Sequence, residues 1–192
     1  PAIQVGLLVL VVTAPAFIFF SQKGPGAMHA PWLISLAAGL VVGGLSQFSR
    51  LCTVGGFRDL FLFKKSILIF GYLAVLVGVF LVNISFGNFH LGFENQPIAH
   101  TDGLWNFLGM ALAGFCSVLL GGCPLRQLIM TGEGNSDSAV TVLGLAAGAA
   151  FAHNFGLAAS GAGPTLNGEI AVVVGFIVAL IIAVVNTKRA NA

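Results

Sequence analysis

Two cysteines stand at breaks between long apolar runs, and the residues around them suggest chemistry on sulfur. Both segments combine a cysteine with paired glycines and an arginine: Cys52, Gly55, Gly56 and Arg58 in the first, and Gly121, Gly122, Cys123 and Arg126 in the second. A thiol close to a cation can be reactive or can act as a soft contact for sulfur. Paired glycines allow the chain to bend where a helix is interrupted. The two segments therefore predict a site for a small anion, with thiols that can be reactive or can contact sulfur.

Each of these residues also has a plain structural interpretation. Both arginines could anchor the chain at the cytoplasmic membrane face, and a cysteine inside a membrane is usually a small hydrophobe. We expect the second case for Cys116, which lies in the middle of an apolar run. His153 and Asn154 lie in another run, where they either form a hydrogen bond between helices or line the pathway. We expect no metal site, because no histidine or further cysteine lies at ligand spacing, and no cofactor.

The composition identifies the environment of this site. Of the 192 residues, 57% are hydrophobic and only 7% are charged, whereas a soluble domain carries about 25% charged residues. A net charge of +2 without a basic stripe excludes a nucleic-acid-binding protein. No acid pair, nucleophile–base spacing or phosphate loop indicates an enzyme. The sequence therefore predicts an all-α integral membrane protein, with the lipid bilayer as its main surroundings.

Six apolar runs are long enough to be membrane spans: Val5–Phe20, Trp32–Phe48, Ile67–Phe86, Leu104–Leu120, Val140–Ala159 and Ile170–Val185. The two cysteine segments are too apolar for solvent loops and too short for spans. They predict short half-inserted (re-entrant) helices, and Pro124 fits the first turn of the second. Asn135 fits an N-cap of the fifth span, and Gly134 fits the turn before it. Residues 1–192 are thus expected to form a single transmembrane domain.

A weak internal repeat relates the two cysteine segments. A shift of 71 residues places Gly43 on Gly114, Ser46 on Ser117 and Cys52 on Cys123. The repeat units cover about 33–86 and 104–159. Repeated segments broken by glycine or proline are typical of transporters with discontinuous helices. Small residues at three- and four-residue spacing are expected to let the helices pack closely, as at Gly39, Gly43, Gly44, Gly71, Gly78, Gly144, Ala147, Gly148 and Gly156.

The cations predict the orientation. With six alternating spans, one side of the membrane holds seven of the eight Lys and Arg residues, which are Arg50, Arg58, Lys64, Lys65, Arg126, Lys188 and Arg189. Only Lys23 lies on the other side. Because cytoplasmic loops carry the excess of Lys and Arg, both termini are expected in the cytoplasm.

Four stretches of the sequence together resemble a known family: Arg50-Leu51-Cys52-Thr53, Phe57-Arg58-Asp59, Gly121-Gly122-Cys123-Pro124-Leu125-Arg126 and Gly132-Glu133-Gly134-Asn135-Ser136-Asp137. The chain resembles the YeeE/YedE sulfur-transport family, most closely its YedE-like branch linked to selenium metabolism, from about Leu33 to Gly163. The resemblance implies an inner-membrane protein that passes a small inorganic sulfur or selenium anion, such as thiosulfate. It also implies that Cys52 and Cys123 contact this anion through S–H hydrogen bonds.

Members of this family are about twice as long and contain two related halves. The chain is therefore expected to be one half, such as the C-terminal half of a longer chain, or to pair as a homo-oligomer. Two functions remain open. One is a transporter or channel for thiosulfate or a selenium analogue. The other is a membrane partner that passes sulfur or selenium through its cysteines to a cytosolic sulfur-carrier protein.

Overall fold

The computed structural model describes residues 30–92 and 100–190, together with the helical residues 2, 5, 6, 9 and 13. The two long ranges form seven helices: α2 (Trp32–Ser49), α3 (Thr53–Phe63), α4 (Ile67–Ser85), α5 (Gly103–Leu119), α6 (Pro124–Gly132), α7 (Ser136–Asn154) and α8 (Leu166–Ala190). Within these ranges the only β-type pairing is an isolated bridge between Ser160 and Gly163. The predicted all-α fold is confirmed.

Within the described residues, four segments are long and apolar enough to cross a membrane: Trp32–Phe63, Ile67–Ser85, Gly103–Gly132 and Leu166–Lys188. Two of them join a long helix to the short helix that follows it. Helix α7 is 19 residues long but is not among the four. Most of the predicted span Val5–Phe20 lies outside the described residues. The count of six spans therefore stays a prediction.

Local sequence signals set several helix boundaries. The Asn135 side chain accepts a hydrogen bond from the Ser138 N–H at 2.9 Å, and Gly134 has a φ of 94°. Pro124 is the first residue of α6. These three predictions are confirmed. The predicted extension of the fifth span to Ala159 is wrong, because α7 ends at Asn154 and a left-handed glycine follows shortly afterwards.

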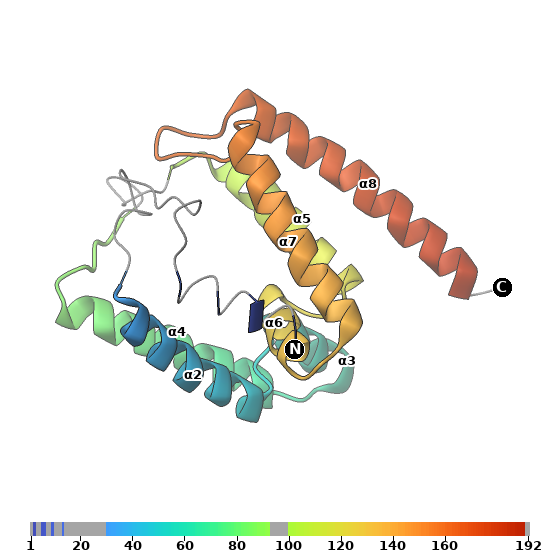
Figure 1. Cartoon of the computed structure of the whole chain (residues 1–192). Coiled ribbons are helices and arrows are strands. Elements are labelled where there is room, and N and C mark those ends of the chain that lie inside the picture. The colour runs from blue at the N-terminus through green and yellow to red at the C-terminus, as the bar shows by residue number, and fades with distance from the viewer. Residues whose placement is uncertain are drawn as a thin grey trace.

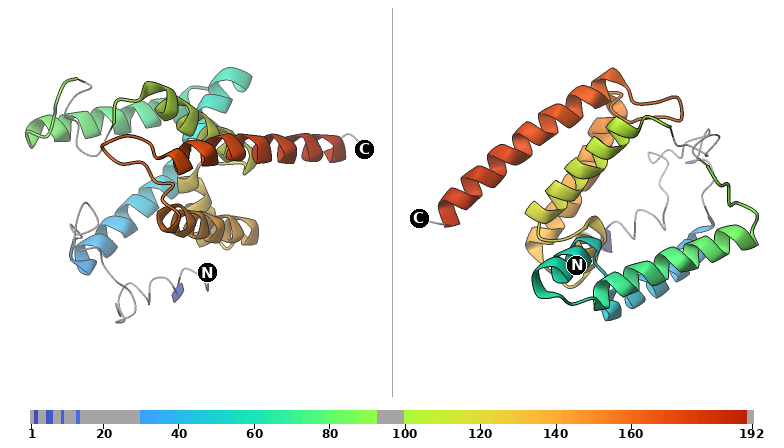
Figure 2. Two further views of the ribbon diagram at one scale, coloured as in Figure 1. Left: turned by 90° about the horizontal axis from the view of Figure 1, so that it is seen from above. Right: turned by 180° about the vertical axis from the view of Figure 1, so that it is seen from behind.

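The short helices lie where the long ones meet. Figure 1 shows α2 and α4 leading away from α3 and α6 in one direction, and α5 and α7 in another. Helix α3 packs against α4, α6 packs against α7, and the short helices also contact α5 and α2, respectively. Helix α8 packs on α5 and ends far from the short helices (Figure 2). The order long–short–long thus occurs twice, while the repeat units 33–86 and 104–159 stay a prediction.

The described chain buries few of its own apolar side chains. Its buried hydrophobic residues are Cys52, Cys123, Val142 and Ala179. Among the glycines expected to pack helices together, Gly71 does lie against another segment, since a methyl group there would lie 3.6 Å from Leu51 Cδ1, but six others do not. A methyl group added at any of them would meet no other atom of the described chain within 4 Å: Gly39, Gly43, Gly44, Gly78, Gly144 and Gly148. The expectation of close helix contact is therefore wrong for these positions within the described chain. On α2, Gly39, Gly43 and Gly44 instead line a cavity of about 570 Å³ whose other wall includes Leu125, Leu128 and Ile129 of α6.

Candidate functional site

Cys52 is the N-cap residue of α3. Its extended backbone joins α2 to α3, and its sulfur accepts a hydrogen bond from the Gly55 N–H at 3.3 Å. A cap of this kind satisfies one of the N–H groups that have no partner within the helix. The side chain is buried. The break between the two helices therefore holds this thiol in one place.

Cys123 has the equivalent position on the second short helix. It is the N-cap residue of α6 and is buried, but its sulfur accepts no cap hydrogen bond. Gly121, with a φ of 75°, turns the chain between α5 and this cap. The Cys52 side chain lies near the backbone N–H and the thiol of Cys123. Two cysteines 71 positions apart thus meet at the N-terminal ends of two short helices.

A cavity of about 700 Å³ opens beside Cys52. Its walls come from α3 and α6, with Gly114 and Val118 of α5 and Leu68 of α4. Five residues predicted for the pathway line it: Cys52, Gly55, Arg58, Gly121 and Arg126. Arg50 and Asp59 line it too. The cavity therefore combines a soft thiol with three cations, which is a suitable lining for a small sulfur-containing anion.

Two of the three arginines have carboxylate partners. Arg58 donates to Asp59 Oδ1 from Nε at 3.0 Å and from Nη2 at 2.8 Å. Arg126 donates from Nη1 to Gln47 Oε1 at 3.3 Å, and its Nη2 lies 3.8 Å from Glu133 Oε2. The Arg126 side chain is 22% exposed and that of Arg58 is 57% exposed. Arg126 is thus the more firmly held of the two cations.

Sequence reasoning missed the residues that hold Arg126. Gln47 Nε2 donates to Glu133 Oε1, so Gln47 bridges the arginine and the carboxylate and ties α2 to α6. Gln47 is an amide at the end of an apolar run, and Glu133 lies in one of the stretches that resemble the sulfur-transport family. Either feature was a usable signal. The contact between Gln47 and Glu133 could not be predicted from the sequence, because 86 positions separate the two residues.

Five predicted pathway residues do not line this cavity: Cys123, Gly56, Gly122, His153 and Asn154. Gly56 is buried where a methyl group would lie 3.5 Å from the backbone N of Ile69, so it serves the packing of α3 on α4. A methyl group at Gly122 would lie 3.5 Å from the Arg126 side chain. His153 and Asn154 are exposed at the end of α7, and Asn154 Nδ2 donates to Ala150 O of its own helix at 2.8 Å.

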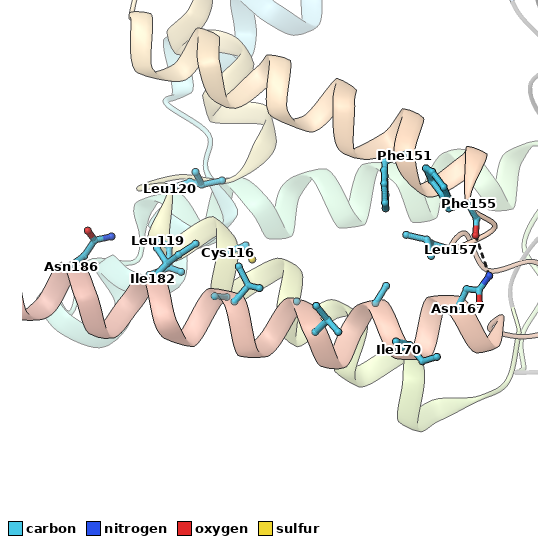
Figure 3. Close-up of a pocket in the computed structure, with 15 residues that line it drawn as sticks. Cys116, Leu119, Leu120, Phe151, Phe155, Leu157, Asn167, Ile170, Ile182 and Asn186 are labelled. Carbon is cyan, nitrogen blue, oxygen red and sulfur yellow. Dashed lines mark hydrogen bonds between the residues drawn. The ribbon is translucent and has the colours of Figure 1, made fainter.

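A second cavity, larger than the one beside Cys52, holds the third cysteine and is of another kind. It measures about 1000 Å³ and lies between α5, α7 and α8, where Cys116, Leu119 and Ile182 are part of its wall (Figure 3). One polar contact at its edge joins Asn167 Nδ2 to Phe155 O at 3.2 Å. Aliphatic and aromatic side chains form most of the remaining wall. Such a surface suits lipid or another helix and offers an anion few partners.

Comparison with known proteins agrees with this geometry. A family model described as sulphur transport matches residues 48–191. This range includes Cys52 and Cys123, all three arginines of the cavity and both short helices. The chain matches none of the curated proteins and none of the solved structures with which it was compared. The family match covers most of the sequence, and it shows that the chain belongs to the YeeE/YedE sulphur transport family.

Proposed function

We propose that this protein passes a small sulfur-containing anion, thiosulfate or a selenium analogue, through the cavity beside Cys52. The observation that carries the proposal is the meeting of Cys52 and Cys123 at the ends of two short helices, next to a cavity lined by three arginines. Membership of a sulphur transport family supports the coarser function, a membrane transporter of sulfur compounds.

The chemistry of the lining favours such an anion over others. The N-terminal ends of α3 and α6 carry partial positive charge, which stabilises an anion near either cysteine. Arginine adds planar N–H donors for oxygen atoms. A thiol adds a polarizable contact and a weak donor for a terminal sulfur or selenium atom. Thiosulfate carries oxygen at one end and sulfur at the other, so it suits both kinds of group.

We further propose that a second half or a second copy of the chain completes the pathway. Within the described residues few apolar side chains are buried, and the face of α7 that carries Gly144 and Gly148 has no neighbour within 4 Å. In a bilayer such faces pack against lipid or against other helices. We place the protein in the inner membrane with both termini in the cytoplasm, on the seven-to-one distribution of its cations.

Uptake by proteoliposomes tests the transport proposal. The protein is expected to take up labelled thiosulfate faster than empty liposomes do, and faster than it takes up sulfate, which lacks the soft terminal atom. A selenium analogue measured beside thiosulfate identifies the preferred substrate. Equal uptake with and without the protein would contradict the proposal. An intact-mass gain of one sulfur or selenium atom on the protein would instead favour transfer through the cysteines to a cytosolic carrier.

A further inference from the structure

We propose that Arg50 recognises the anion in the cavity beside Cys52, and this inference rests on the function proposed above. Arg50 directly follows α2 and precedes Cys52 by two residues. Its side chain lines the same cavity as the thiol. A guanidinium in this position can pair with the oxygen atoms of an anion whose sulfur or selenium atom contacts the cysteine.

The charge of Arg50 is not compensated in the described part of the chain. Asp59 pairs with Arg58 at 2.8 Å, and Glu133 lies 3.8 Å from Arg126. Within residues 30–92 and 100–190, the guanidinium of Arg50 has neither a hydrogen bond nor an ion pair. Arg50 is therefore the cation of the lining whose donors remain available to a ligand.

The backbone of Arg50 is unusual for an arginine. Its φ of 51° and ψ of 33° lie in the left-handed region. The Arg50 N–H donates to Gln47 O at 3.3 Å, and the Leu51 N–H donates to Ser46 O at 3.2 Å. Glycine is the residue that usually ends a helix in this way, because it has no side chain to oppose the conformation. Strained residues of this kind cluster at functional sites.

The end of α5 provides an internal comparison. Gly121 has a φ of 75° there, and its N–H donates to Val118 O at 3.1 Å, while the Gly122 N–H donates to Ser117 O at 3.0 Å. The shift of 71 residues that pairs Cys52 with Cys123 also pairs Arg50 with Gly121. The turn after α5 thus has glycine at the left-handed position, whereas the turn after α2 has a strained arginine there. The side chain of this arginine lines the cavity.

The reaction of Cys52 with charged thiol reagents tests this role. Cys116→Ser and Cys123→Ser leave Cys52 as the only cysteine of the full chain, and its rates with anionic and cationic methanethiosulfonates are compared at low salt. Arg50→Gly is expected to lower the anionic-to-cationic rate ratio roughly tenfold, since one charge acts with opposite sign on the two reagents. Arg50→Lys is expected to keep the ratio within about threefold, since it keeps the charge. Arg50→Gly should also melt at or above the parent Tm, because it removes the strain.

Lys64→Gly is the matched control. Among the described residues, Lys64 is the only other non-glycine residue with a left-handed backbone, with a φ of 56°. It does not line the cavity. This variant loses one cation and the same kind of strain, and its rate ratio should stay within about twofold of the parent's. An unchanged ratio in Arg50→Gly, or an equal fall in Lys64→Gly, would overturn the assignment. This result is independent of the proposed transport function. The rate ratio reports the electrostatic potential at Cys52, whether or not thiosulfate crosses the membrane.

Discussion

Cys52→Ser and Cys123→Ser are each expected to reduce thiosulfate uptake roughly tenfold or more, because each removes the soft contact for the terminal sulfur atom. Both variants should still fold. Serine is a preferred N-cap residue, so at position 52 its oxygen can replace the sulfur that now accepts the Gly55 N–H. At position 123 it can add a cap that α6 lacks. Initial uptake rates in proteoliposomes with matched protein content measure the effect.

Cys116→Ser is the control for these two variants. Cys116 lies in the wall of the apolar cavity between α5, α7 and α8, not beside Cys52. A serine hydroxyl there can donate to the carbonyl four residues earlier. Uptake should therefore remain near the parent rate. Equal losses in all three serine variants would show a general effect of removing thiols and would contradict a specific role for the paired cysteines.

Arg126→Gln is expected to have the second large effect, a loss of uptake of roughly tenfold or more, because a partly buried cation then disappears from the pathway. Arg58→Gln should cost only about twofold to threefold, since its side chain is 57% exposed and already paired with Asp59. Uptake rates of the two variants, measured side by side, check this order.

A double variant separates recognition of the anion from support of the fold. Arg126→Gln leaves the Glu133 carboxylate without its cation, which should lower stability by about 1 kcal/mol. Adding Glu133→Gln removes that carboxylate and is expected to restore the Tm in detergent, while uptake stays low. Recovery of uptake together with the Tm would show that Arg126 only supports the contact of α2 with α6, and would contradict its role in the pathway.

Local signals in the sequence were enough to place the first turns of α6 and α7. Pro124 and Asn135 act on the first turn of their own helices, so their roles follow from residue type and position alone. The two cysteines could be singled out because each interrupts an apolar run beside glycines. That they lie near each other follows only from the way the rest of the chain brings the ends of the two short helices together.

Long-range contacts could not be predicted in the same way. Nothing local links Gln47 to Arg126 or to Glu133, which are 79 and 86 residues away. The glycine-rich faces failed as a guide for a related reason. Spacing shows that such a face permits close packing, but not whether the neighbour belongs to the same chain. The apolar run continues past the residue where α7 ends, so the sequence predicts His153 deep inside a span, whereas it lies one residue before the end of α7.

Reversible blocking of the paired cysteines tests the central claim most directly, namely that the anion passes beside them. The Cys116→Ser protein is treated with a bulky methanethiosulfonate, freed of excess reagent and assayed for thiosulfate uptake, and peptide masses give the modified fraction at Cys52 and Cys123. We predict that uptake falls in proportion to this fraction and returns when a reductant removes the adduct. Uptake at the unmodified rate in fully modified protein would contradict the account.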